Sequence, residues 1–564
     1  MKHRTSYRVL RWQLALLRAL HLGEQQAVLL QAVLMGLAGA LAALAFEVAA
    51  DGVQWLCTGL WCGRVACFEQ LAAWQRVLLP IAGALPAALV LLWAHRTDAR
   101  RVPDYMEAFS LRDGRLPRRQ GLLRSVSAVL SLGSGSCIGK EGALMQIAAV
   151  AASAVGRWLH VSPPSLRLMV GCGAAAGMTA AFHTPLASCL FVCEVVVGSF
   201  SIGYLAPLLV ASCAAYALLW AWGGQGALFA CHLSFHSARS VAACVLLALL
   251  LAPLGRVWVA LLGYMRRCLS GRLCFLLPRM AAAGLLVGLA AWWQPSIVGN
   301  GQEAVAALLA GSFPPVQAAL LLLLKVLLTA VVFGVGTMGG VLTPTLMVGC
   351  FAGWLFGCVL APVPGFGPEA PTAFALVGMA VFFGAAARTP VTAILLLIEL
   401  TMEASLIFPL MVAVGVGYAV VRLLPRGSLY DSAPDGDTSP FEQGLAVLRV
   451  GDVMRREPLR LAQDAPLSCL WRAQLRHPGT SLPVVNAAGE LVGLVPPQGQ
   501  SPERVPMLRV GDDLPTALRV FERSPRWDAL PVMGADGRLA GMLSRVELLQ
   551  TTALMFRREL AQRR

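Results

Sequence analysis

The sequence predicts a polytopic α-helical membrane protein followed by a small α/β domain. The first observation is the composition, since 57% of the 564 residues are hydrophobic and 13% are charged, against about 25% charged residues in soluble domains. The second is the charge distribution: no Lys, Arg, Asp or Glu occurs between residues 195 and 238, and Glu369 is the only one between residues 326 and 387. Apolar runs of this length are typical of membrane-spanning helices, and they lack the alternation that a β-barrel needs.

The net charge of +15 favours the lipid membrane over nucleic acid as a partner. Lys and Arg cluster in the loops and tails, as the positive-inside rule describes, so we expect no nucleic acid. The sequence shows no convincing nucleophile, nucleotide-hydrolysis loop or metal-ligand spacing. We therefore expect neither an enzyme nor a metal protein.

Three cysteines, Cys57, Cys62 and Cys67, share the short loop between the first two predicted spans. They include a disulfide if this loop faces an oxidising compartment. A metal cluster is the alternative, which the lack of a paired Cys-x-x-Cys disfavours.

The first half of the chain begins with residues 1–25, which mix Lys and Arg with Trp and Leu. This pattern predicts an amphipathic segment along the cytoplasmic membrane face. Many of the apolar segments that follow are shorter than the roughly 20 residues that cross a bilayer, which predicts half-helices whose ends meet inside the protein. The segments are 26–49, 77–94, 125–132, 143–155, 168–181, 186–197 and 204–222.

The second half repeats the first. The glycine loop 133–139 has a counterpart at 334–340, and the stretch 173–194, with its Thr-Pro and final Glu, has one at 384–399. Two motifs in the same order at nearly the same offset indicate duplication. The halves are about 26–225 and 240–424, and the second contains segments 241–262, 280–293, 316–333, 345–360, 373–387, 391–400 and 406–424.

The glycine loop 133–142 leads into an apolar helix and carries Glu141. Small residues let backbone N–H groups approach a ligand, and a helix N-terminus adds unpaired N–H donors and a positive dipole end that favour a bare anion. An ionisable residue inside a membrane segment indicates function. We therefore predict that the protein moves a small anion past Glu141. A membrane scaffold without transport is the alternative, but it would not need paired glycine loops.

The tail is polar from residue 425, and we assign 431–444 as a linker. Residues 445–564 form a soluble domain with its own repeat, in which 481–495 and 529–543 each predict strand, turn and strand. A helical stretch precedes each of them, at 467–476 and 514–523.

Three motifs in the membrane part resemble those of the CLC family of chloride channels and proton-coupled chloride antiporters. Residues 139–142 match Gly-[Lys/Arg]-Glu-Gly-Pro, with Ala143 at the proline position. Residues 340–344 match Gly-x-Phe-x-Pro, with Leu342 at the phenylalanine, and Tyr430 matches the tyrosine near the end of the membrane domain. The resemblance covers about 26–430 and implies the family's inverted repeat of broken, tilted helices. The tail resembles a pair of CBS domains.

The resemblance implies the site residues. Glu141 would be the gate, whose carboxylate competes with anions and swings aside when protonated. The amides of Val341 and Leu342, with the Tyr430 hydroxyl, would line the central anion site, and amides near Lys140, Glu141 and Gly142 the outer one. The Lys140 ammonium would attract anions or extend to the membrane interface.

By the same resemblance, we expect a homodimer in the bacterial inner membrane, with a pore in each subunit and both termini in the cytoplasm. The function implied is transmembrane chloride transport by a voltage-gated-type channel, with bound chloride as substrate and no cofactor. A proton-coupled chloride or fluoride antiporter is the alternative.

Two departures from the family bear on that alternative. The serine motif Gly-Ser-Gly-Ile-Pro is replaced at 99–103 by Ala-Arg-Arg-Val-Pro, and the usual inner proton glutamate is replaced by Val195. Glu194 is adjacent, but consecutive helical residues point about 100° apart. It remains a candidate for the proton path, although we expect Glu194 and Glu399 to bond exposed backbone groups or face the cytoplasmic edge. These features favour passive conduction.

For the CBS pair, we favour a dimerisation and folding role. The alternative is an adenine-nucleotide sensor, because Ser544 and Glu547 resemble the family's ribose contact. The corresponding stretch of the first repeat is interrupted by Pro496-Pro497.

Overall fold

The structure of the chain is a computed structural model, whose described residues fall in two compact units, one within residues 1–434 and one within 435–564. The predicted amphipathic segment (apart from its last two residues), the stretch 99–103 and the linker 431–444 lie outside the described residues. The structure describes residues 24–97, 105–110, 114–198, 200–223, 228–229, 238–271, 275–424, 427–430, 449–456, 459–476, 481–496, 499, 501–503, 505–524, 526–534 and 536–548.

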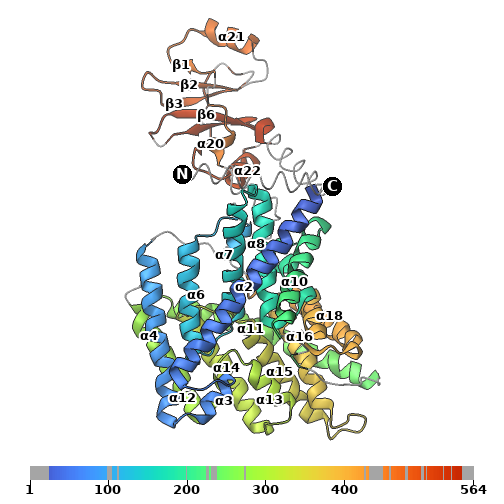
Figure 1. The fold of residues 1–564 in the computed structure, drawn as a ribbon. Helices are drawn as coiled ribbons and strands as arrows, with labels where there is room; N and C mark the ends of the chain where they lie inside the picture. Colours follow the sequence, from blue (N-terminus) through green and yellow to red (C-terminus); the bar gives the residue numbers. More distant parts are fainter. Residues whose placement is uncertain are drawn as a thin grey trace. The chain divides into compact units, whose positions relative to one another are not determined.

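The first half of the membrane unit is helical (Figure 1). Prolines begin α8 and α9, positions where the missing N–H costs no helical hydrogen bond. The described helices of this half are α2 (Glu24–Thr58), α3 (Arg64–Gln70), α4 (Ala73–Thr97), α5 (Tyr105–Ser110), α6 (Arg118–Gly133), α7 (Glu141–Trp158), α8 (Pro163–Phe182), α9 (Pro185–Phe191), the π-helical turn η1 (Val192–Val197) and α10 (Ile202–Ala221).

The second half follows the same plan, and proline again begins α14 and α17. Its described helices are α11 (Ala238–Leu269), α12 (Leu276–Trp293), η3 (Pro295–Ile297), α13 (Gln302–Leu309), α14 (Pro315–Gly334), α15 (Leu342–Leu360), α16 (Ala370–Ala387), α17 (Pro390–Thr401), η4 (Ala404–Leu406) and α18 (Ile407–Leu423).

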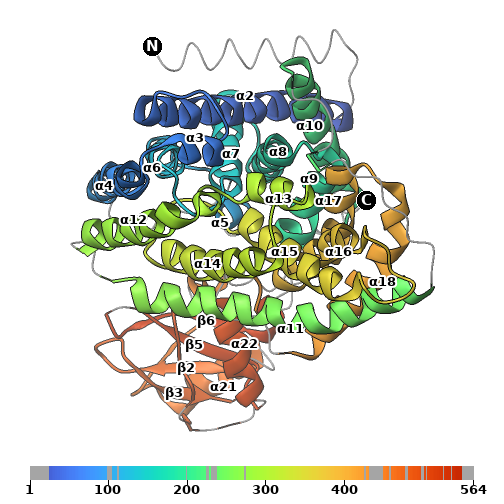
Figure 2. The same ribbon diagram turned by 90° about the horizontal axis from the view of Figure 1, so that it is seen from below.

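The backbone confirms the duplication. In the two glycine loops, Gly135 and Gly336 both adopt positive φ, at 92° and 94°, and the residues that end α8 and α16, His183 and Arg388, are both left-handed, at 59° and 60°. α7 packs along α8 as α15 packs along α16. α2 covers the first group and α11 the second, and Figure 2 shows these two long helices on opposite sides of the unit.

Burial separates inner helices from outer ones. In α8, α15 and α16, 83%, 72% and 89% of the apolar window is buried, against 33–39% in the other helices that are long enough to span. The outer helices therefore leave most of their apolar surface for lipid or for a partner subunit. Ten described helices are long and apolar enough to cross a membrane, which confirms the predicted fold class.

The expectation that many spans are too short is only partly right. α8, α15 and α16 each extend beyond the predicted apolar runs and reach spanning length, whereas the segments beginning at Pro185 and Pro390 remain short apolar helices. The added first turns contain prolines, Pro163 and Pro164 in α8, Pro344 in α15 and Pro371 in α16, which a hydropathy pattern leaves out. The short helices α3, α5 and α13 were not predicted, because they lack a long apolar run.

Lys325 is a charged residue that the sequence analysis left without a role. It lies inside α14 and is completely buried. Its ammonium donates to the carbonyls of Ile297 at 3.2 Å and Gly299 at 2.8 Å. These carbonyls lie at and just beyond the end of η3, so the side chain holds this turn against α14.

The second unit contains two sheets built on one plan. In each sheet, a short first strand is parallel to the second, and the second is antiparallel to the third. The helices α21 (Leu467–Arg476) and α22 (Leu514–Arg523) match the predicted ranges. The remaining elements are α20 (Val450–Val453), β1 (Leu461–Ala462), β2 (Leu482–Val485), β3 (Leu491–Val495), β4 (Leu508–Arg509), β5 (Ala529–Met533) and β6 (Leu539–Ser544).

Candidate anion site at two helix N-termini

The two glycine loops of the repeat are hydrogen-bonded to each other. The Gly139 N–H donates to the Gly340 carbonyl and the Gly340 N–H donates to the Gly139 carbonyl, each at 2.7 Å, which makes an antiparallel bridge. A methyl group on either glycine would run into the opposite loop and the Glu141 carboxylate. Because the two loops approach each other this closely, both positions require glycine.

Two helices begin directly after this bridge. α7 starts at Glu141 with Lys140 as its N-cap residue, and α15 starts at Leu342 with Val341 as its N-cap residue. The first N–H groups of a helix have no acceptor within it, and they carry the positive end of its dipole. Apart from Tyr430, the residues predicted to bind the anion, including Gly142, therefore lie at two helix N-termini joined by one backbone bridge.

The Glu141 side chain is buried between these two helix starts, with 1% of its surface exposed. The Thr343 hydroxyl donates a hydrogen bond to Glu141 Oε1. Thr343 lies in the first turn of α15, so the carboxylate from one repeat is held at the helix N-terminus of the other. Its second oxygen, Oε2, is buried and has no hydrogen-bond partner among the described residues. A negative group thus occupies a place suited to a small anion.

Tyr430 comes from a separate part of the chain. Its ring packs edge-on against Phe191 of α9, with 5.1 Å between ring centroids. The Leu429 N–H and the Ser428 hydroxyl donate to the last carbonyls of α16, at 3.1 and 2.8 Å, and these bonds fix the approach of the tyrosine. The structure therefore packs Tyr430 against α9 and the end of α16.

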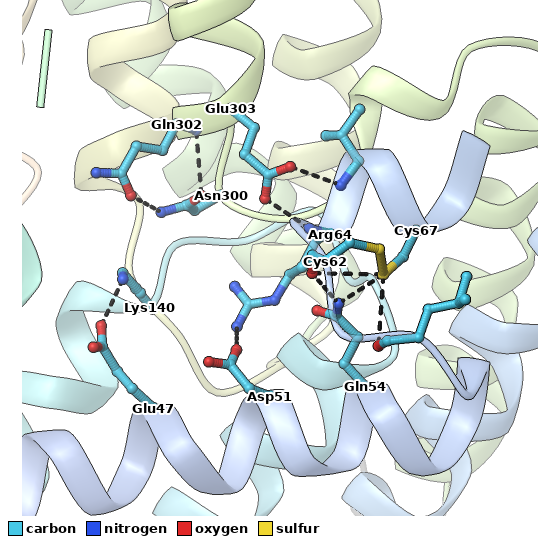
Figure 3. A network of polar contacts seen from close by, with 12 residues as sticks. Glu47, Asp51, Gln54, Cys62, Arg64, Cys67, Lys140, Asn300, Gln302 and Glu303 are labelled. Carbon is cyan, nitrogen blue, oxygen red and sulfur yellow. Dashed lines mark hydrogen bonds and ion pairs between the residues drawn. A yellow bond between two sulfur atoms is a disulfide. The ribbon is translucent and has the colours of Figure 1, made fainter. Parts of the chain in front are cut away.

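The Lys140 side chain is engaged by Glu47 of α2 (Figure 3). The ammonium lies 2.6 Å from Glu47 Oε1, and the two side chains are 19% and 27% exposed. The ammonium is thus paired with a carboxylate of α2, and its predicted attraction for anions or extension to the membrane interface stays a prediction.

The same face of α2 carries two further polar contacts. Asp51, one turn after Glu47, pairs with Arg64 at 3.4 Å. The Gln54 amide donates to the Cys62 carbonyl at 2.7 Å. These contacts join α2 to α3 and to the loop before it (Figure 3).

A disulfide joins Cys62, in the loop before α3, to Cys67 inside α3, while Cys57 is free. The disulfide alternative for these cysteines is thus the one found. Glu303 of α13 accepts from the N–H groups of Arg64 and Val65 at 2.8 and 2.9 Å. These bonds satisfy the start of α3, which has no side-chain cap of its own.

Glu194 and Glu399 each cap a helix that belongs to the other repeat. Glu194 accepts from the Val391 and Thr392 N–H groups, at 3.3 and 2.9 Å, at the start of α17. Glu399 accepts from the Leu186 and Ala187 N–H groups at the start of α9, at 2.9 and 2.7 Å. The expectation that both glutamates bond exposed backbone groups is confirmed.

The residues proposed for a nucleotide contact, Ser544 and Glu547, bond one another. The Ser544 N–H donates to Glu547 Oε2 at 2.9 Å, and the Glu547 N–H donates to Ser544 Oγ at 3.1 Å. Arg455 lies 3.5 Å from the other Glu547 oxygen. This pattern is a helix-capping arrangement. It occupies the Ser544 hydroxyl and the Glu547 carboxylate, which are the groups that would bind a ribose.

Sequence reasoning missed Thr343 and Glu47. Thr343 occupies a variable position in its motif, and its only signal was a hydroxyl in the first turn of the helix. Glu47 carried a stronger signal, since it is an ionisable residue inside the apolar segment 26–49. The stretch that replaces the serine motif, 99–103, lies outside the described residues, so its contribution to the site stays a prediction.

Family models match most of the chain. A model described as voltage-gated chloride channel matches residues 80–422. A model described as CBS domain matches residues 450–497 and 503–553. These ranges fall within the helical unit and the two-sheet unit respectively.

Similar proteins are found in bacteria. A putative chloride channel protein ClcB-like of Ralstonia nicotianae is 37% identical over 407 residues, which cover 71% of this chain and 95% of that protein. The voltage-gated ClC-type chloride channel ClcB of Escherichia coli is 33% identical over 414 residues, covering 71% and 97%. The crystal structure of a slow cyanobacterial Cl⁻/H⁺ antiporter has the same fold, with a TM-score of 0.64 at 22% identity over 72% of this chain and 97% of that one.

Proposed function

The chain belongs to the family of voltage-gated-type chloride channels, and we propose that it conducts chloride passively through a pore gated by Glu141. The observation that carries the proposal is the position of the Glu141 carboxylate, which is buried at the N-terminus of α15 and bonded by Thr343. A carboxylate at that position excludes chloride by charge and by volume.

Opening follows from protonation of this carboxylate. The ionised group is favoured by the helix dipole and by the Thr343 hydroxyl. Protonation removes the charge that both interactions stabilise. The neutral side chain then moves away, and chloride binds in its place. The backbone dipoles that remain bind an anion without a full opposite charge, which lets it bind and leave quickly. The amides of Val341 and Leu342, those around Lys140 and Gly142, and the Tyr430 hydroxyl are the proposed chloride ligands.

Passive conduction is favoured over proton exchange by the neighbourhood of Glu194. A proton carrier inside a membrane protein must be free to gain and lose its proton. Glu194 accepts three hydrogen bonds, two from α17 N–H groups and one from the Thr392 hydroxyl, and these bonds hold its carboxylate at the start of α17. Val195, the next residue, offers no titratable group. The relative from Escherichia coli is also named a channel.

Proton-coupled exchange of chloride or fluoride is the second candidate, because the structural neighbour at 22% identity is described as a Cl⁻/H⁺ antiporter. In that case Glu194 would carry the proton, and its bonds to α17 would have to break in each cycle.

We place the protein in the bacterial inner membrane as a homodimer with one pore per subunit. The Cys62–Cys67 disulfide supports a periplasmic location for the loop before α3. α2 is a single helix of 35 residues that ends near this loop, so its first residue then lies on the cytoplasmic side. The C-terminal CBS pair shares that side in the proposal.

For the CBS pair, we propose a folding and assembly role. The mutual capping of Ser544 and Glu547 supports this role over nucleotide binding. Equilibrium binding of adenine nucleotides to the whole protein tests it, and a saturable signal that Glu547→Ala abolishes would favour the sensor.

Anion efflux from proteoliposomes tests the transport proposal. Vesicles loaded with potassium chloride, diluted into an impermeant salt with valinomycin present, should release chloride faster than vesicles without protein. Release of fluoride in preference to chloride would change the substrate. No release of either anion at any pH would favour the scaffold alternative.

A further inference from the structure

Three polar side chains follow one face of α2 beside the anion site. Glu47, Asp51 and Gln54 are separated by helical spacings that align them, and each contacts a different part of the protein. Asp51 and Gln54 reach α3 and the loop before it, whereas Glu47 reaches Lys140 (Figure 3). Of these three, Glu47 is therefore the one bonded to the glycine loop that carries the gate.

The Glu47–Lys140 pair is built for a strong interaction. Its charged atoms are 2.6 Å apart, and both side chains are mostly shielded from water. Charges in such surroundings act on one another more strongly than exposed ones, because the effective dielectric constant is lower. Lys140 directly precedes Glu141 in the chain, so an uncompensated ammonium here would add a positive charge to the loop that carries the gate.

We propose that Glu47 is a positioning residue that sets the pH at which the Glu141 gate opens, by compensating the charge of Lys140. The inference rests on the proposed function, because it names a regulator of the same site. With the pair intact, the two charges cancel. Glu141 then competes with chloride under the influence of the helix dipoles and Thr343, and not of a bare cation.

The neighbours of the gate are an uncharged hydroxyl and the two charged members of this pair. α15 contributes Thr343, whose hydroxyl is bonded to the Glu141 carboxylate and carries no charge. Lys140, on the gate's own loop, contributes the cation. Glu47, on α2, contributes the carboxylate that balances it.

The variant Glu47→Gln leaves a side chain of nearly the same size and removes its charge. The Lys140 ammonium then favours the ionised, closed form of Glu141. More acid is needed to open the gate, so the pH of half-maximal chloride efflux should fall by roughly one unit, at the low end of the effect of a neighbouring cation on a carboxylate.

Two further variants separate this role from a merely structural one. Asp51→Asn also removes a carboxylate from the same face of α2, but from a pair with Arg64, and should leave the midpoint at the wild-type value. The double variant Glu47→Gln/Lys140→Gln removes both charges of the pair and should return the midpoint to that value. A structural pair would lower thermal stability in both Glu47 variants without moving the midpoint.

The experiment is chloride efflux from proteoliposomes of the full chain, measured from pH 4 to pH 8 for wild type and the three variants. A midpoint of Glu47→Gln that coincides with those of wild type and Asp51→Asn would overturn the inference. So would a double variant that keeps the midpoint of Glu47→Gln. Failure of the proposed function is distinguishable, because wild-type efflux would then be absent or independent of pH.

Discussion

Glu141 differs from an ordinary acidic residue at a helix start in what its carboxylate contacts. Such a residue usually bonds N–H groups of its own helix, whereas Glu141 reaches the first turn of α15 and accepts from Thr343. The contact joins the two halves of the duplicated chain. At the residue scale, the proposed gate is therefore a group from one repeat that lies at the helix N-terminus of the other.

The variant Glu141→Gln tests the gate itself. Glutamine keeps the size of the side chain and cannot ionise, so its occupancy of the site no longer depends on pH. Chloride efflux should be fast at neutral pH and constant between pH 4 and pH 8. A pH profile like that of the wild type, measured in the same vesicles, would remove Glu141 from the gate.

The variant Thr343→Val tests the contact that holds the carboxylate. Valine matches the shape of threonine and removes the donor. A hydrogen bond to a charged group contributes about 1.5–3 kcal/mol. Because one pKa unit corresponds to about 1.4 kcal/mol, the low end of this range is about one pKa unit. The closed, ionised form should lose this stabilisation, so the midpoint of chloride efflux should rise by at least roughly one pH unit.

Thr345→Val is the matched control, because it makes the same change in the same helix. The Thr345 hydroxyl donates to the Val341 carbonyl at 2.6 Å and not to Glu141. A midpoint that moves equally in both variants would mean that general packing, and not the bond to Glu141, sets the pH dependence.

Pairings between residues far apart in the sequence were the part of the site that could not be predicted. Glu141, Lys140 and Tyr430 were identified by motif, but Thr343 and Glu47 became visible only through contacts between distant segments. Motifs record which residues a helix start needs, whereas partners depend on how the helices pack. Glu47 was nevertheless open to prediction, as an acidic residue within an apolar segment.

At the scale of elements, the two halves are fastened by reciprocal caps. Glu194 closes the start of α17 and Glu399 closes the start of α9. Both helices begin with proline after threonine, and neither has a side-chain cap from its own N-cap residue. Each repeat thus supplies the acceptor that the other lacks, which explains why matching glutamates recur at the same offset.

The variant Glu399→Gln tests the fastening. It replaces a charged acceptor of two N–H groups with a neutral one, which should cost about 1–2 kcal/mol of stability. The thermal unfolding midpoint in detergent should fall by a few degrees, while chloride efflux keeps its pH dependence. Glu369→Gln is the control, since Glu369 is the N-cap residue of α16 without a side-chain cap bond. Equal midpoints for the two variants would contradict the capping account.

Helix positions were largely predictable from hydropathy, and helix ends were not. The helices α21 and α22 match their predicted bounds because amphipathic periodicity and polar flanks mark both ends. α8 and α16 extend beyond the predicted apolar runs, because their first turns begin at Pro163 and Ala370 outside those runs. Hydropathy detects the apolar run that lies in lipid, whereas a helix can continue for one or more turns beyond the end of that run.

At the scale of the whole molecule, the membrane unit is expected to transport without the CBS pair. The relatives from Ralstonia nicotianae and Escherichia coli match 71% of this chain with 95% and 97% of their own length, and the channel family model ends at residue 422. A chain truncated after Tyr430 retains every proposed chloride ligand. It should release chloride from proteoliposomes at a rate per protein within a few-fold of the full chain. A stable, purified truncation without efflux would show that the tail is required.

The central claim, passive chloride conduction, is tested most directly by the reversal potential of the reconstituted protein under opposed chloride and proton gradients. Val195 has no titratable group, and the Glu194 carboxylate is bonded to the start of α17. The account predicts a reversal potential at the chloride equilibrium value, unmoved when the proton gradient is changed. A stable displacement that follows the proton gradient, and that Glu194→Gln abolishes, would contradict it and identify Glu194 as a proton carrier.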